Sequence, residues 1–125
     1  MKIQYIERIV NIQMYEQGKQ VSIPVDAIEG IDTGLCITPL NGDSTRGYVL
    51  THTRTGYILP NLGVEIAPTI DVAKMWLEKV HKLLDWNMPV DKMKDACEQQ
   101  YGSRKEFLFK LNDAFDEACE KVKTT

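Results

Sequence analysis

The stretch from Thr69 to Trp86 constrains the fold more than any other, because its apolar residues recur with the period of an α-helix. The apolar arc covers nearly half of the helix circumference, which is more than one neighbouring layer needs. We therefore expect this helix to pack against a sheet and against other helices at once. Thr69 is the expected N-cap, and Asn87 and Pro89 are expected to end the helix. The arc consists of Val72, Ala73, Trp76, Leu77, Val80, Leu83 and Leu84, with Met75 at its edge.

The chain before this helix has the alternation of short strands. Residues 21–25 and 35–37 each predict a strand, and Pro39 ends the second one. Pro24 cannot donate a backbone hydrogen bond, so its strand is expected at a sheet edge. The polar residues 26–33, around Gly30, predict a connection between these two strands.

A hairpin is predicted where residues 47–53 and 57–59 flank a loop of Arg54, Thr55 and Gly56. Its register is open by one residue, so His52 shares a face with either Tyr57 or Ile58. Residues 64–66 are a candidate for one further short pairing. Residues 2–15 fit either a strand with a bulge near Glu7 and Arg8 or a short helix.

Two more helices are expected after the first. One covers residues 90–101, with Val90, Met93, Ala96 and Cys97 on one side, and Gly102 ends it. Ser103 and Glu106 have the spacing of a capping box, which begins the next helix. The fold class is therefore α+β: a single domain, 1–125, whose β-rich half (1–68) forms an antiparallel sheet of four to six strands packed on one face by three helices from residues 69–125. The buried stripe of the last helix is expected to be Phe107, Leu108, Leu111, Ala114, Phe115, Ala118, Cys119 and Val122.

Charge and composition exclude several classes of function. The chain has 15 basic and 18 acidic residues, a net charge of −3, so it lacks the cationic surplus of a non-specific nucleic-acid binder. No apolar run approaches the roughly 20 residues of a membrane span. The first residues lack the apolar core of a secretory signal, and three cysteines are an odd number for a disulfide framework. We expect a cytoplasmic protein in a reducing compartment.

The motifs of common enzymes are missing. The sequence contains no CxxC, HxxxH or HExxH spacing and no glycine-rich phosphate loop, so we expect no metal, no cofactor and no enzymatic activity. Cys97 and Cys119 fall on apolar helix stripes, as core residues do. His52 is interpreted as a sheet-surface residue, and a catalytic centre would need it to converge with Cys36 and Thr51 in a pocket. His81, near the end of its helix, is expected to be favoured in its protonated form by the helix dipole.

A first candidate site would bind an anion such as a nucleotide. A helix N-terminus binds anions through its free N–H groups. Ser103, Arg104 and Lys105 combine such an N-terminus with positive charge, and Arg46 and Arg54 are candidates to join them from the sheet.

A second candidate site is an acidic face on the last helix. Phe109 projects into this face, where an aromatic residue breaks the pattern. Phe109 either lies under the preceding helix or a dimer mate, or anchors a basic protein partner that the charges attract. We expect protein–protein contact through this face, with a homodimer as a further expectation. Its carboxylates are Glu106, Asp113, Asp116, Glu117 and Glu120.

One resemblance extends this hypothesis. The hairpin LTHTRTGY, followed by a helix that begins around Ala73 and ends in Leu84, Asp85 and Trp86, resembles small uncharacterised proteins of phages and mobile elements. Such proteins are often stoichiometric inhibitors of host defence. The resemblance implies an inhibitor of a host defence or nucleic-acid-processing protein, and it implies no site residues.

Overall fold

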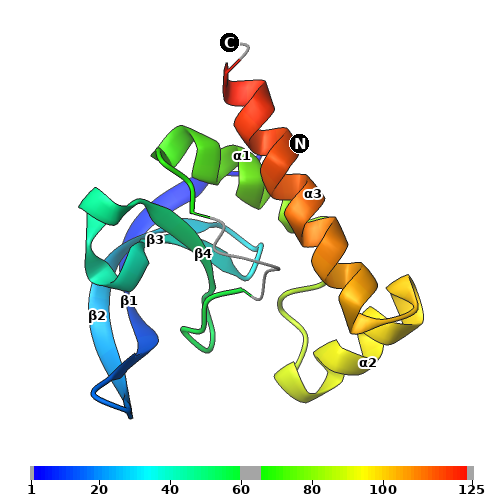
Figure 1. The fold of residues 1–125 in the computed structure, drawn as a ribbon, viewed down its shortest axis with the longest axis horizontal. Coiled ribbons are helices and arrows are strands. Elements are labelled where there is room, and N and C mark those ends of the chain that lie inside the picture. The colour runs from blue at the N-terminus through cyan, green and yellow to red at the C-terminus, as the bar shows by residue number, and fades with distance from the viewer. Residues whose placement is uncertain (1, 60–65, 124–125) are drawn as a thin grey trace.

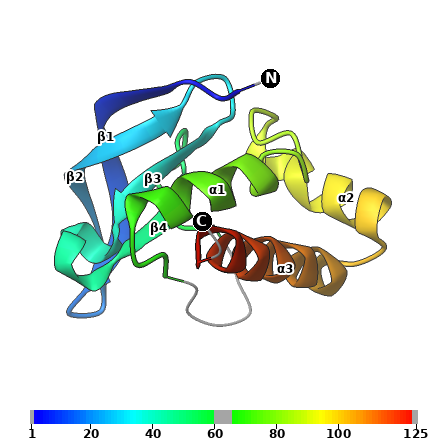
Figure 2. The ribbon, with the colours of Figure 1, turned by 90° about the horizontal axis from the view of Figure 1, so that it is seen from above.

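The computed structural model describes residues 2–59 and 66–123. It confirms the α+β class: a four-stranded antiparallel sheet of order β1-β2-β3-β4 is followed by three helices (Figures 1 and 2). Helix α1 lies on the sheet against β3 and β4, and α3 packs beside α1. The strands are β1 (Tyr5–Glu16), β2 (Lys19–Gly30), β3 (Leu35–Pro39) and β4 (Tyr48–His52), and the helices are α1 (Ile70–Val80), α2 (Val90–Tyr101) and α3 (Arg104–Lys123).

The first fifteen residues form a strand and not a helix. β1 pairs with β2 one residue to one, from Tyr5 opposite Gly30 to Glu16 opposite Lys19, so the predicted bulge near Glu7 and Arg8 is wrong. The apolar residues of β1 change from odd to even positions along the strand because its two ends bury opposite faces. Tyr5 packs against the helices on one face, and Val10 is buried on the other.

β2 extends further than the sequence predicted, and it lies between β1 and β3, so the expectation from Pro24 of a sheet-edge strand is wrong. It runs to Gly30, so the expected connection over residues 26–33 is wrong, and the turn begins only after Gly30. The Arg8 side chain donates to the Glu29 carboxylate at 2.6 Å across the two strands. The Thr33 hydroxyl donates to the Gly30 carbonyl at 2.7 Å and stabilises the turn. Tertiary pairing therefore overrides the polar composition of this segment.

The hairpin after β4 is confirmed, and its register is now fixed. Thr51 lies opposite Ile58, and the His52 N–H donates to the Tyr57 carbonyl at 2.9 Å, so His52 is paired with Tyr57. Gly56 has the expected positive φ of 78°. Residues 64 and 65 of the predicted last pairing lie outside the described part, and a pairing with Tyr48 is made by Ala67.

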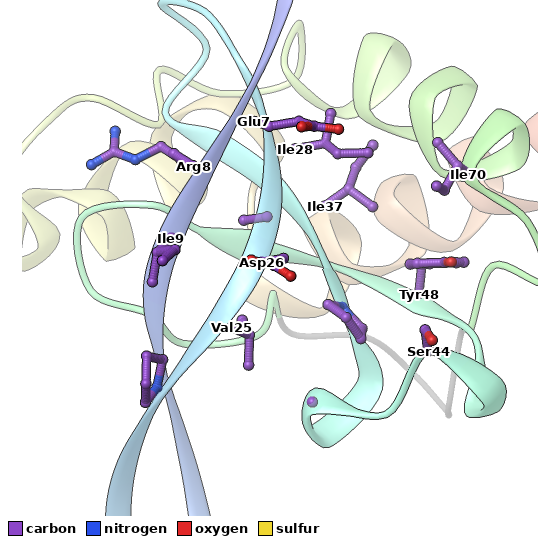
Figure 3. Close-up of a pocket in the computed structure, with 14 residues that line it drawn as sticks. Glu7, Arg8, Ile9, Val25, Asp26, Ile28, Ile37, Ser44, Tyr48 and Ile70 are labelled. Carbon is purple, nitrogen blue, oxygen red and sulfur yellow. The ribbon is translucent and has the colours of Figure 1, made fainter.

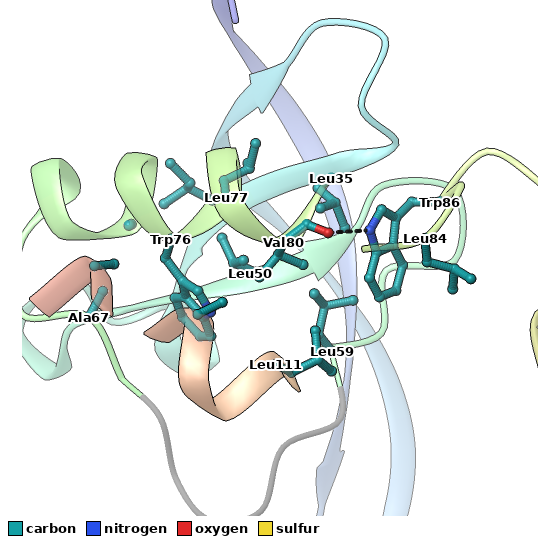
Figure 4. Close-up of a cluster of buried hydrophobic side chains, with 14 of the residues drawn as sticks. Leu35, Leu50, Leu59, Ala67, Trp76, Leu77, Val80, Leu84, Trp86 and Leu111 are labelled. Atoms are coloured by element: carbon teal, nitrogen blue, oxygen red, sulfur yellow. Dashed lines mark hydrogen bonds between the residues drawn. The ribbon is translucent and has the colours of Figure 1, made fainter. Parts of the chain in front are cut away.

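α1 begins as predicted and ends early. The Thr69 hydroxyl accepts from the Val72 N–H at 3.2 Å, which confirms the N-cap. The helix ends at Val80, so the prediction that it continues to Trp86 is wrong. The Trp86 indole N–H donates to the Val80 carbonyl at 3.0 Å and satisfies one of the last helical acceptors (Figure 4). Leu84 and Trp86 still reach the core, from the turns that follow.

α2 ends and α3 begins where the sequence predicted. Gly102 ends α2 with a φ of 90°, and the Ser103 hydroxyl accepts from the Glu106 N–H at 3.1 Å. On α2, Cys97 is buried, whereas Val90 is exposed. Within the predicted stripe of α3, the side chain of Val122 lies outside the described part; Phe107, Leu111, Ala114 and Ala118 are buried, and Leu108, Phe115 and Cys119 are partly buried.

One core joins the two halves of the chain. Leu35, Ile37 and Leu50 on the sheet are almost fully buried beneath α1 (Figure 4). Trp76 of α1 meets Phe115 of α3 edge to face, with ring centroids 4.8 Å apart. This arrangement leaves the opposite side of α3 without a neighbour in the described chain, and it also leaves part of the sheet face uncovered.

Candidate functional site

The outward side of α3 carries the predicted acidic face. Phe109 is 41% exposed, which excludes the interpretation that it lies under the preceding helix. The Lys105 ammonium group lies 5.9 Å from the centroid of its ring. Successive helix residues are about 100° apart, so Phe109 lies within the arc of the carboxylates and opposite the buried stripe. All five carboxylate residues, Glu106, Asp113, Asp116, Glu117 and Glu120, are exposed.

Among the described residues, Lys105 lies over the Phe109 ring within this face, and further polar interactions occur toward its margin. Glu117 accepts from the Lys79 ammonium group of α1 at 3.1 Å, and its side chain is 65% exposed. Asp116 accepts a long hydrogen bond of 3.4 Å from Asn112. A surface ion pair of this kind is worth roughly 0–1 kcal/mol, so the face keeps its negative character.

The residues of the anion hypothesis lie in different parts of the fold. Ser103, Arg104 and Lys105 are at the start of α3, whereas Arg46 belongs to a 3₁₀ turn, Ser44–Arg46, at the opposite end of the molecule (Figures 1 and 2). Arg54 lines a separate polar cleft of about 450 Å³ with Arg8 and Glu29. The structure therefore does not bring the two sheet arginines to the helix N-terminus.

His52 is buried, so its interpretation as a sheet-surface residue is wrong. Only 6% of it is exposed. Its Nε2 lies 2.8 Å from the Trp86 carbonyl oxygen and its Nδ1 lies 2.9 Å from the Thr55 hydroxyl. A carbonyl can only accept, so Nε2 carries a proton and donates to Trp86, while Nδ1 shares a hydrogen bond with the Thr55 hydroxyl. The ring joins the hairpin loop to the segment that follows α1.

Cys36, Thr51 and His52 do not converge. Cys36 pairs with Thr51, whereas His52 pairs with Leu35, one residue along, so the cysteine and the histidine point to opposite faces of the sheet. Burial raises the pKa of the Cys36 thiol to about 11, which disfavours the thiolate that a nucleophile needs. In the part of the chain that the structure describes, no three His, Cys, Asp or Glu side chains gather to hold a metal ion.

The pKa of His81 is lowered, whereas the helix dipole was expected to favour the protonated ring. Partial burial and the positive charge of Lys82 lower the pKa below its ordinary value, and Glu78 opposes them. Burial therefore outweighs the favourable helix dipole.

The sequence did not reveal a groove on the helix-side face of the sheet, with a volume of about 840 Å³ (Figure 3). The β2–β3 ladder does not extend along the groove, since it contains only the pairs Ile28–Ile37 and Glu29–Cys36. Glu7 and Asp26 line the groove from β1 and β2, and Ile70 of α1 lines the far wall. The 3₁₀ turns after β3 contribute Gly42 and Ser44.

Two prolines open this groove. Successive residues of an antiparallel strand direct their backbone groups to alternate sides. Tyr48 exchanges hydrogen bonds with Ala67 on its outer side, so Pro39, opposite Tyr48, turns its nitrogen toward β2. Gln13 donates outward to Gly56, so by the same alternation Pro24 turns its nitrogen toward β3. Neither nitrogen has a hydrogen to donate, and the ladder stops before it reaches them.

Comparisons of the chain with protein-family models, curated proteins and solved structures gave no match. Within the described residues, every helix is too short or too polar to cross a lipid bilayer.

Proposed function

We propose that this protein is a non-enzymatic binding protein that captures a positively charged protein partner on the outer face of α3. The observation that carries the proposal is Phe109, an aromatic ring that is 41% exposed and lies within an arc of five exposed carboxylates. Charge attracts the partner over a distance, and the ring supplies the apolar contact that is buried in the complex. Covering a whole Phe side chain contributes roughly 1.5–3 kcal/mol, of which the exposed part of Phe109 would supply a fraction.

The positions of the reactive side chains support a role without catalysis. His52 uses both ring nitrogens in structural hydrogen bonds, and the Cys36 thiol is buried on the opposite face of the sheet. The resemblance to phage proteins extends the proposal to inhibition of a host protein. Nucleic-acid-processing proteins carry the positive surface that would meet this acidic face.

The test compares two exposed aromatic residues. Phe109→Ala is expected to weaken the purified complex, measured by calorimetry, about tenfold or more, because a central aromatic residue is a typical hot spot. Tyr15→Ala is the matched control, since Tyr15 is 73% exposed at the far end of the β1–β2 hairpin. Both variants should melt within about 2 °C of the wild type, as surface substitutions do. Equal binding by the two variants would contradict the proposal.

A homodimer is the second candidate for this face, because a second copy would also cover Phe109. Light scattering on the wild type and on Phe109→Ala separates the two: a dimer that becomes a monomer assigns the face to self-association. The anion-binding alternative predicts a nucleotide-dependent rise in melting temperature that Arg104→Ala abolishes. The separation of Arg46 from the start of α3 disfavours that alternative.

A further inference from the structure

The groove between β2 and β3 has unneutralised negative charge. Glu7 and Asp26 make no ion pair within the described residues. Arg8 also lines the groove, but its side chain extends away from Glu7 and Asp26 and is paired with Glu29 at 2.6 Å (Figure 3). A ligand that enters the groove therefore meets two carboxylates without an ion pair, Glu7 and Asp26, beside a guanidinium group that is already paired.

The apolar groups of the groove alternate with these carboxylates. The register places Glu7 beside Ile28 and Ile9 beside Asp26, so the two strands present a checkerboard of acids and isoleucines on one face. Ile9 is 67% exposed, which is unusual for a side chain that large. Ile70 continues the apolar surface toward α1, and Ile37 lies buried at the floor of the groove.

The groove also offers unpaired backbone. By strand alternation, the N–H and C=O of Asp26 point toward β3, as those of Ile28 do. Continuing the register would place Asp26 opposite Pro39, which has no N–H, so the Asp26 carbonyl receives no hydrogen bond from that position. Asp26 thus combines a carboxylate without an ion pair among the described residues with a backbone carbonyl that Pro39 cannot bond.

We propose that this groove binds an extended, basic segment of a partner protein. The ammonium or guanidinium group of a lysine or arginine lies between Glu7 and Asp26, and its aliphatic stem covers Ile28. The backbone of the segment donates to the Asp26 carbonyl, in the manner of strand addition. An extended peptide is the one occupant that supplies the cation, the apolar stem and the backbone partners together, whereas a small amine supplies only the first.

This second site is independent of the outer face of α3, because none of the described residues that line the groove belongs to that helix. A partner with two basic regions could occupy both. The two proposals can therefore fail separately, and Phe109→Ala is expected to leave groove binding unchanged.

The test uses a fluorescein-labelled peptide that alternates lysine with valine, titrated by fluorescence anisotropy, with the alternating glutamate–valine peptide as its opposite. The lysine peptide is expected to bind and the glutamate peptide is not. Glu7→Gln together with Asp26→Asn should weaken binding of the lysine peptide about tenfold. The matched control is Glu16→Gln, which removes a carboxylate of the same hairpin outside the groove and should weaken it less than twofold.

Amide shifts in nitrogen-15 NMR spectra give a second readout. The lysine peptide is expected to shift the amides of Asp26, Ile28 and Ile37 more than those around Glu16. Loss of affinity in Glu16→Gln equal to that in the double variant would mean non-specific attraction and would overturn the proposal. It is also overturned if n-butylamine produces the same shifts and the peptide binds no more tightly, which would describe a site for small amines.

Discussion

At the scale of single residues, the buried His52 has a structural role as a hydrogen-bonding link. Its ring connects Thr55 in the hairpin loop to the Trp86 carbonyl, two segments that are far apart in the sequence. Both partners have poor access to water at this position, so the histidine satisfies polar groups that would otherwise be costly to bury.

His52→Leu is therefore expected to lower the free energy of unfolding by about 1–3 kcal/mol, because it leaves the Trp86 carbonyl and the Thr55 hydroxyl without their partner. Urea denaturation followed by circular dichroism measures the change. His81→Gln is the control, since the partly exposed His81 ring makes no hydrogen bond of this kind to the residues that the structure describes, and it should change stability by less than about 0.5 kcal/mol at neutral pH.

His81 predicts a pH dependence. Its folded pKa lies below the ordinary value of 6.5, so the unfolded chain binds the proton more readily than the folded one. This contribution to stability is complete above pH 6.5 and is lost as the pH falls from there through the folded pKa. Urea unfolding between about pH 7.5 and pH 5 should show a smaller loss of stability in His81→Gln than in the wild type. If the free energy of unfolding changed equally with pH in the two proteins, the proton would bind at a group other than His81.

At the scale of elements, the loop after β4 docks on β1 through a glycine. Gly56 has a φ of 78°, and a Cβ at this position would lie 2.1 Å from the Asn11 carbonyl oxygen. The Gly56 carbonyl also accepts from the Gln13 N–H at 2.9 Å. The close approach of two backbones fixes the path of the hairpin loop across the sheet.

Gly56→Ala should consequently destabilise the protein by about 3 kcal/mol or more, because the backbone of Asn11 has to move. Gly18 is a matched comparison: it has nearly the same φ, 77°, with no atom within 4 Å of a Cβ. Gly18→Ala should cost only about 1 kcal/mol, the strain of the left-handed conformation alone. Thermal unfolding of the two variants measures the difference, and similar losses would show that backbone strain and not contact dominates at Gly56.

At the scale of the whole molecule, the sheet and the helices share one core. Leu35, Ile37 and Leu50 are between 0% and 1% exposed beneath α1. Without residues 69–125 these side chains would face water, and an exposed apolar surface of that size does not support a stable sheet.

The fragment 1–68 should therefore remain unfolded, with the narrow amide dispersion of a disordered chain in nitrogen-15 NMR spectra. The full chain should unfold in one transition, with coincident curves from tryptophan fluorescence and far-ultraviolet circular dichroism. A fragment with native-like dispersion would show that the β-rich half is a domain of its own.

The sequence predicted those features that depend on nearby residues. The caps at Thr69 and Ser103 and the end of α2 at Gly102 are local hydrogen-bonding and backbone effects, and they are confirmed. The end of α1 was missed because the acceptor at Val80 is satisfied by Trp86, which reaches back through the tertiary fold. The exposure of Phe109 followed from helical periodicity alone.

The groove could not be read from the sequence for a related reason. Pro24 and Pro39 are each recognisable as strand breakers, but Pro24 does not put its strand at a sheet edge: β2 lies between β1 and β3, and only its ladder with β3 stops short of Pro24. Their joint effect depends on the register that brings both nitrogens into the same space between two strands. That register is set by Ile28 and Ile37, and single-sequence patterns do not align strands across a turn.

The two prolines give the groove a property that side chains alone would not. Because Pro24 and Pro39 have no N–H to donate, the interruption of the β2–β3 ladder beside the groove is part of the covalent structure and does not need a ligand to create it. A site that is preorganised in this way loses little conformational entropy when it is filled. Evolution could therefore replace the side chains along its walls and exchange one ligand for another, while the aperture itself, and the fold around it, stayed the same.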